Sequence, residues 1–314
     1  MARTREGFFG KAIKVRSFHQ SVLLQEVIEN LKVSRGKRYI DATLGGGGHT
    51  EAILKKGGRV LALDWDKEAI IYCAKKFKLA LKQEKGVLVA QNQNLVLIWS
   101  GFTKLREVAE KFGFDKVDGV LFDLGISSHQ LGEKQRGFSF QESGPLDMRM
   151  DPNRQAVTAA DLINKLERRQ LEDLFFKYSQ EKYSRTIANA VAFTRLKKPI
   201  ETTEELTQVI RGIVPKRERI DPATRVFMAL RIVVNSEILN LEEVLPQTVD
   251  LLVNDGKLLV ISFHSLEDRV VKNFMRERND LSVLTKRPII AGEEEVLGNP
   301  RSRSAKLRIA QKIH

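Results

Sequence analysis

Short apolar runs alternate with amphipathic stretches along the first half of the chain. The apolar runs lie at residues 39–42, 59–63, 95–99 and 117–122, and stretches with helical spacing lie between them at 50–56, 67–78 and 104–111. In one such stretch Ile70, Ala74 and Phe77 fall on a single stripe, as in an amphipathic helix. Short continuous apolar strands are typical of parallel sheets that are covered on both faces. The pattern therefore predicts a doubly wound α/β sheet.

The alternation stops between residues 131 and 221, where the sequence predicts helices and loops but no strand. The expected helices span 158–165, 168–178, 183–196 and 204–214. Thr202 and Glu205 have the spacing of a capping box at the start of the last of these.

The sheet pattern returns in the last third of the chain. Asp221 and Pro222 read as an N-cap followed by proline at the first helical position, which predicts a long helix over 223–241. Strands are expected at 257–262 and 305–313. We therefore expect a discontinuous α/β core, residues 1–131 and 222–314, interrupted by a helical insertion at 132–221.

Charge adds a candidate partner to this picture. The formal net charge is +13, with nine Lys and Arg against three acids in residues 1–38 and eleven against seven in 264–314. Such a balance favours an anionic partner such as nucleic acid, although a solvated surface would also carry it. No apolar run approaches the ~20 residues that span a bilayer, so we expect a cytoplasmic protein without a membrane segment. The single cysteine, Cys73, excludes an internal disulfide and a multi-cysteine zinc site.

Four consecutive glycines, Gly45 to Gly48, lie between the first expected strand and its helix. Glycines at such a junction allow the backbone to approach a ligand closely. Asp64 ends the next strand, where an acid can accept hydrogen bonds from ribose hydroxyls. These features predict an adenosine-containing cofactor. NAD and S-adenosylmethionine both remain open, although Thr50 stands where the dinucleotide fingerprint prefers Gly or Ala.

Further motifs follow along the chain. They are DLGISSHQ at 123–130, GFSFQESGPLDMRM at 137–150, VISFHSLEDRVVK at 260–272 and NPRSRSAK at 299–306. In this order, and with FHQSVLL at 18–24, they resemble the MraW/RsmH family. The resemblance implies a Rossmann-like class I methyltransferase fold that uses S-adenosylmethionine. It also implies methyl transfer to the exocyclic N4 of a cytidine in the decoding region of 16S ribosomal RNA, within an assembled or nearly assembled small subunit.

The resemblance also implies cofactor-binding residues. They are Gly47, Gly48, His49, Asp64, Phe102, Asp123 and Gln130. The stretch 79–94 is longer than the family usually has, so 87–90 competes with 95–99 as the third strand, and this affects the placement of Phe102.

The residue that accepts the amine proton stays open, with His264, Asp123 and Asp147 as candidates. Cys73 lies in a predicted helix and is poorly placed as a nucleophile, which favours amine methylation over the covalent route to C5. No metal is expected, because His49, His129 and His264 lack the spacing of helical ligand pairs.

The helical insertion is expected to recognise the substrate. Phe138, Phe140 and Arg149 are its candidates for holding an unstacked nucleotide, although the two phenylalanines would equally suit its core. An NAD-dependent oxidoreductase and a catalytically silent RNA-binding protein are the competing functional interpretations. Transfer of label from S-adenosylmethionine would distinguish both from a methyltransferase.

Overall fold

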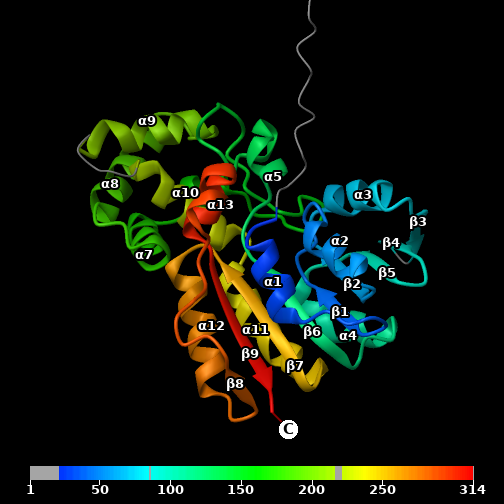
Figure 1. The fold of residues 1–314 in the computed structure, drawn as a ribbon. Helices are drawn as coiled ribbons and strands as arrows, with labels where there is room; N and C mark the ends of the chain where they lie inside the picture. The colour runs from blue at the N-terminus through cyan, green and yellow to red at the C-terminus, as the bar shows by residue number, and fades with distance from the viewer. Residues whose placement is uncertain (1–20, 85, 216–220, 314) are drawn as a thin grey trace, which may run out of the picture.

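One mixed sheet forms the centre of the molecule (Figure 1). The computed structural model describes residues 21–84, 86–215 and 221–313, so the basic segment 1–16 and the motif residues 18–20 lie outside the described residues. Within the described ranges nine strands pair in the order β3-β4-β5-β2-β1-β6-β7-β9-β8. They are β1 (Arg38–Asp41), β2 (Arg59–Asp64), β3 (Leu81–Glu84), β4 (Val87–Gln91), β5 (Leu95–Trp99), β6 (Val117–Asp123), β7 (Leu252–Ser262), β8 (Leu281–Val283) and β9 (Lys306–Lys312).

The five central strands, β5, β2, β1, β6 and β7, are parallel, and β9 joins them antiparallel. This arrangement confirms the expected Rossmann-like α/β sheet. The strand order reverses direction between β1 and β6, and open α/β sheets bind their ligands outside the carboxyl ends of the strands at such a switch point.

Helices cover both faces of the sheet and form a separate group beside it (Figure 1). Their bounds are α1 (Leu24–Leu31), α2 (Gly48–Lys55), α3 (Lys67–Lys76), α4 (Leu105–Lys111), α5 (Ser128–Gly132), α6 (Ala159–Lys165), α7 (Arg168–Ser179), α8 (Ser184–Arg195), α9 (Thr203–Ile213), α10 (Pro222–Val234), α11 (Glu237–Leu251), α12 (Ser265–Glu277) and α13 (Glu293–Gly298).

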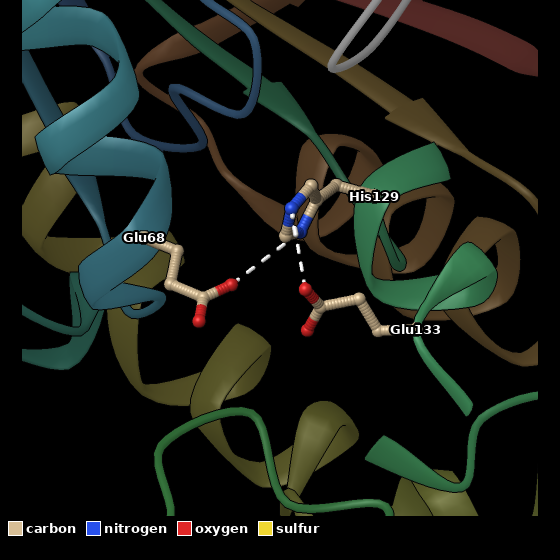
Figure 2. Close-up of side chains that lie close together, drawn as sticks. All are labelled: Glu68, His129 and Glu133. Atoms are coloured by element: carbon tan, nitrogen blue, oxygen red, sulfur yellow. Dashed lines mark ion pairs between the residues drawn. The ribbon is translucent and has the colours of Figure 1, made fainter. Parts of the chain in front are cut away.

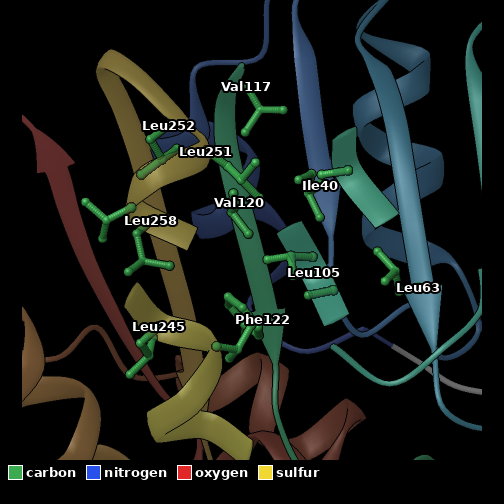
Figure 3. Close-up of a cluster of buried hydrophobic side chains, with 14 of the residues drawn as sticks. Ile40, Leu63, Leu105, Val117, Val120, Phe122, Leu245, Leu251, Leu252 and Leu258 are labelled. Carbon is green, nitrogen blue, oxygen red and sulfur yellow. The ribbon is translucent and has the colours of Figure 1, made fainter. Parts of the chain in front are cut away.

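Alternate residues of each central strand enter two different apolar clusters. On β6, Val120 and Phe122 pack with α4, α11 and α12, and Figure 3 shows them beside Leu105 of α4 and Leu245 of α11. Leu121 faces the other way and packs with α1, α2 and α3. Burial on both faces explains why these strands read as continuous apolar runs.

The helical segment has its own apolar cluster, built from α6 to α10. Phe138 is buried in it and Phe140 packs edge-to-face on Phe227 of α10, with ring centroids 5.2 Å apart. The two phenylalanines therefore contribute to the core of this segment. Because the cluster includes α10, the expected domain boundary at 221/222 cuts through it. The boundary itself stays a prediction.

The structure confirms the helix caps that the sequence predicts. Thr202 and Glu205 form the capping box of α9, and Asp221 caps α10 with Pro222 at its first position. Asp66, which follows β2, accepts a hydrogen bond from the Glu68 amide and caps α3.

The single helix expected over 223–241 is wrong, because the chain breaks between α10 and α11. Ser236 has a left-handed conformation, with φ of 50°. The side chain of buried Asn235 donates to the Met148 carbonyl and accepts from the Met150 amide, at 2.8 Å each. These contacts, with a segment about 85 residues earlier in the chain, hold Asn235 at the point where α10 ends and α11 has not yet begun.

The choice between 87–90 and 95–99 as the third strand is settled by pairing. Strand β5 pairs parallel with β2, whereas β3 and β4 form an antiparallel hairpin on the outer side of β5. The extra residues therefore extend the sheet edge, and Phe102 keeps its place just after β5.

We found no helix, within the ranges that the structure describes, that is long and apolar enough to cross a membrane.

Asn235→Ala is expected to lower the free energy of unfolding by about 2–4 kcal/mol, because each buried group left without a partner costs about 1–3 kcal/mol. Chemical denaturation followed by circular dichroism measures the change. Asn189→Ala, on the exposed side of α8, is the matched control and should cost about 0.5 kcal/mol or less. Equal losses in the two variants would contradict the role of Asn235.

Candidate functional site

A cavity of about 910 Å³, its open mouth included, lies at the carboxyl edge of the sheet, where β2, β1, β6 and β7 end. Its polar lining comes from Thr43, Asp64, Asp66, Asp123, Ser127, Gln130, Asn235, Glu237, Asn240, Glu267 and Arg301. Its apolar lining includes Trp65, Phe102, Leu124, Ile126, Met150, Leu241 and Phe263.

The glycine segment 45–48 turns the chain from β1 into α2. Gly45 lines the cavity, and its amide donates to the Asp64 carboxylate at 2.7 Å. Gly47 has φ of 70°, and a Cβ there would lie 2.9 Å from Cys73 Sγ. A Cβ on Gly48 would lie 2.2 Å from Ser21 Oγ. Gly47 and Gly48 thus pack behind the cavity wall, while Gly45 forms part of it.

Asp64 ends β2 and faces the cavity. Its two carboxylate oxygens accept from the amides of Gly45 and Asp66, each at 2.7 Å. Burial, and next the negative charge of Asp66, raise the pKa of Asp64 to about 7, although the two amides lower it. A carboxylate held in this way is ready to accept hydrogen bonds from hydroxyl groups of a ligand.

Gln130 lines the cavity, and its side chain hydrogen-bonds to residues on both sides of the rim. Its amide nitrogen donates to Asp66 at 2.8 Å, and its side chain also closes a capping box with Ser127 at the start of α5. Arg136 pairs with the same Asp66 carboxylate at 3.2 Å. Asp66 therefore joins α3 to α5 across the cavity rim.

Asp123 ends β6 in the middle of the cavity. Its carboxylate lies 3.8 Å from Nδ1 of His49, whose Nε2 lies 3.1 Å from the Val22 carbonyl oxygen. His49 is buried behind the wall and does not line the cavity. Nearby Asp41 is also buried, which raises its pKa despite the charge of His49 and a hydrogen bond from Thr50.

The proposed proton acceptors divide into one residue on the cavity and two away from it. Asp123 lines the cavity. Asp147 pairs with Arg149 at 2.6 Å and does not belong to the lining. His264 caps α12, and its Nε2 lies 3.1 Å from Oε1 of Glu267. Glu267 lines the cavity, whereas His264 does not belong to the lining.

Among the residues that the structure describes, two groups have donor atoms close enough to hold a metal ion. Figure 2 shows one, in which His129 lies between Glu68 of α3 and Glu133, with ring nitrogens 3.5 and 3.4 Å from their carboxylates. The other joins Glu237, His264 and Glu267 at the cavity. Ion pairs and helix caps already account for both arrangements, so neither requires a metal.

The structure brings four of the expected cofactor residues to the cavity, namely Asp64, Phe102, Asp123 and Gln130. Gly47, Gly48 and His49 lie behind it. Sequence reasoning missed lining residues that come from the helix break and the last third of the chain, namely Asn235, Glu237, Phe263, Glu267 and Arg301. Phe263, Glu267 and Arg301 lie in motifs that the sequence showed, but Asn235 and Glu237 do not, and only the fold shows that all five meet.

Comparison with known proteins gives a consistent family. A family model described as the MraW methylase family matches residues 16–313. Proteins named Ribosomal RNA small subunit methyltransferase H are similar to this chain. The relative from Carboxydothermus hydrogenoformans is 43% identical, covering 94% of this chain and 98% of its own. Those from Gloeobacter violaceus and Nostoc punctiforme are 45% and 46% identical, covering 99% and 94% of this chain and 94% of each relative.

A solved structure of a putative methyltransferase from Streptococcus mutans in complex with SAH is a more distant likeness. It is 12% identical, with a TM-score of 0.44 over 94% of this chain and 99% of that chain. We draw no functional argument from it.

Asp64→Asn is expected to change how stability depends on pH in the ligand-free protein. The pKa of Asp64 is about 7 in the folded chain and near 4 when unfolded, so the folded form binds more protons between these values. The contribution of Asp64 to stability therefore falls as pH rises from 4 to 7 and then levels off. Denaturation at pH 5 and pH 8 should show wild type losing about 2 kcal/mol relative to the Asn variant. Parallel changes in both proteins would contradict the raised pKa.

Proposed function

The chain belongs to the MraW methylase family, and we propose that it transfers a methyl group from S-adenosylmethionine to the exocyclic N4 of a cytidine in the decoding region of 16S ribosomal RNA. The observation that carries the proposal is near full-length identity of 43–46% to relatives named as methyltransferases of small-subunit ribosomal RNA. The cavity at the switch point of the sheet supports it independently, since such sites bind small-molecule ligands.

The acidic groups in the lining of the cavity would suit the positive charge of S-adenosylmethionine. Asp64 would hold the ribose hydroxyls, and Phe102, which packs edge-to-face on Phe122, would face the adenine. Gly45 lets the backbone approach the ligand, and Asp123 would face the cationic methionyl part. Asp123 and the acids beside it suit a ligand that carries a sulfonium and an ammonium group. Gly47, Gly48 and His49 would support this site from behind, and Gln130 would fix its rim.

The residues of the chain supply alignment and a dry pocket rather than covalent catalysis. S-adenosylmethionine brings an already electrophilic methyl group, so binding it beside the amine removes most of the barrier that orientation imposes. Cys73 is buried in α3, hydrogen-bonds to the Gly45 carbonyl at 3.4 Å, and has a pKa raised by burial. A thiol in this position does not act as the nucleophile that C5 methylation requires.

We propose that the helical segment around 132–221 contacts the RNA and that the target base is unstacked into the cavity. Arg149 and Phe138 are committed to contacts within the segment, so the cavity lining carries the base-recognition groups. The basic segment 1–16 would add phosphate contacts. An assembled or nearly assembled small subunit is the proposed substrate, with the enzyme acting in the cytoplasm and without a metal.

Incubation with S-adenosylmethionine and small subunits that lack the modification should yield N4-methylcytidine and no 5-methylcytidine. Mass spectrometry of nuclease digests separates the two products. Cys73→Ala should retain transfer, because the proposed route has no covalent intermediate. Appearance of 5-methylcytidine, or loss of transfer in a folded Cys73→Ala variant, would contradict the route.

Asp64→Ala should weaken S-adenosylmethionine binding by about 10- to 100-fold for each ribose hydrogen bond that is lost, because a hydrogen bond to a charged acceptor contributes about 1.5–3 kcal/mol. Isothermal titration calorimetry measures the affinity. Asp115→Ala is the matched control, since Asp115 is an exposed partner of Arg38 outside the cavity. Unchanged affinity in Asp64→Ala would remove Asp64 from the cofactor site.

A further inference from the structure

The order of the strands gives the cavity two distinct ends, one beside β2 and one beside β7. Asp64 follows β2, Asp123 follows β6, and Phe263 and Glu267 follow β7, with β1 between β2 and β6. Neighbouring strands lie about 4.8 Å apart, so the end of β7 is about 14 Å from the end of β2. On the proposed function, with adenosine held at Asp64, the base to be methylated enters at the β7 end.

Five carboxylates line the cavity, and four of them are less suited than Glu267 to meet a base at the β7 end. Asp64 and Asp66 lie at the β2 end. Glu237, although close to β7, is paired through both oxygens with Arg231, at 2.8 and 2.9 Å. Asp123 lies between the two ends and faces His49 of α2. Glu237 and Glu267 are thus the two carboxylates at the β7 end. Both oxygens of Glu237 are bound by Arg231, whereas no arginine binds both oxygens of Glu267.

The start of α12 holds the Glu267 side chain in place. Its Oε2 accepts from the amides of Phe263 and His264, at 2.8 and 3.3 Å, and the side chain is 3% exposed. Nδ1 of His264 accepts from the Glu267 amide at 3.4 Å. Nε2 of the same ring lies 3.1 Å from Glu267 Oε1, within ion-pair distance. Both ring nitrogens therefore lie next to Glu267.

We propose that Glu267 is a catalytic residue that accepts a hydrogen bond from the exocyclic amine of the target cytosine, and that His264 is a positioning residue that holds Glu267. The amine lone pair is conjugated with the ring. A carboxylate bound to one amine hydrogen turns the lone pair toward the methyl group and stabilises the positive charge that develops on nitrogen.

The transfer balances with this acceptor. A nitrogen–carbon bond forms as the carbon–sulfur bond breaks, and the bonding electrons pass to sulfur, which becomes a neutral thioether. The nitrogen then loses one proton to Glu267, which releases it to solvent through the open mouth of the cavity.

The surroundings of Glu267 keep it ionised. Burial raises its pKa, but the contacts with His264, the charge of Arg231 and the amide of Phe263 outweigh burial and hold the pKa below the usual value of a glutamate. The position in the first turn of α12 also favours the charged form. An acceptor of this kind is in the working state throughout the neutral range.

Single-turnover methylation of small subunits at saturating S-adenosylmethionine tests the proposal. Glu267→Gln should lower the rate by about 10²-fold or more, which is the usual contribution of a positioned proton acceptor, while the affinity for S-adenosylmethionine stays within about twofold. Asp268→Asn is the matched control. It removes a carboxylate from the same helical turn, but one that pairs with Arg308 of β9 and not with the cavity. Its rate should stay within about threefold of wild type.

His264→Asn separates positioning from proton transfer. Asparagine keeps the helix cap but loses the contact with Glu267 Oε1, so the rate should fall by about tenfold. The wild-type rate should be flat from pH 6 to 8, because the acceptor is ionised throughout. If His264 were the acceptor, His264→Asn would lose as much rate as Glu267→Gln, and the wild-type rate would not be flat over this range.

Retained binding of S-adenosylmethionine shows that a variant is folded. If Glu267→Gln fails this check, Glu267→Asp replaces it, since aspartate keeps the charge but withdraws it by one methylene. That variant should lose about tenfold or more in rate. A near-normal rate in a variant that binds S-adenosylmethionine overturns the assignment of Glu267. Absence of N4-methylcytidine from wild type would instead overturn the proposed function.

Discussion

Parallel pairing of β2, β1, β6 and β7 forces four chain segments to leave the sheet at one edge. That constraint places four features at the cavity, namely the glycine segment, Asp64, Asp123 and the start of α12. More than 200 residues of sequence separate the first from the last. Each segment then needs only a local turn to present a polar group to the cavity. The apolar clusters on both faces hold the strands in register and so keep these groups at fixed separations.

The cavity also concentrates negative charge, and the protein compensates each carboxylate differently. Asp64 is bound by two backbone amides, Asp66 by Gln130 and Arg136, and Glu237 by Arg231. These arrangements remove the repulsion that several acids in one pocket would otherwise cause. The cavity thus gathers acidic side chains within a chain whose net charge is strongly positive. On the proposed function, the acids would face the cationic cofactor and the basic surface would face the RNA.

The sequence was informative where one short segment determines the result. Buried strands, the capping box of α9 and the cap of α10 were predictable because their signals lie within a few residues. The break at Asn235 was not, since its partners Met148 and Met150 are distant along the chain. The same distinction, between local signals and contacts distant along the chain, applies to the residues of the candidate site. Asp64 could be placed from the end of its strand, whereas the burial of His49 behind the wall and the approach of Glu267 depend on tertiary packing.

Cys73 gives the molecule a built-in reporter of local opening. Its sulfur lies against the glycine segment, hydrogen-bonded to the Gly45 carbonyl, and it is the only thiol in the sequence. A thiol reagent can reach it only when α3 separates from that segment, so the alkylation rate measures how often this wall of the cavity opens. Because the wall is shared with the proposed cofactor site, the same rate reports ligand occupancy without any introduced label.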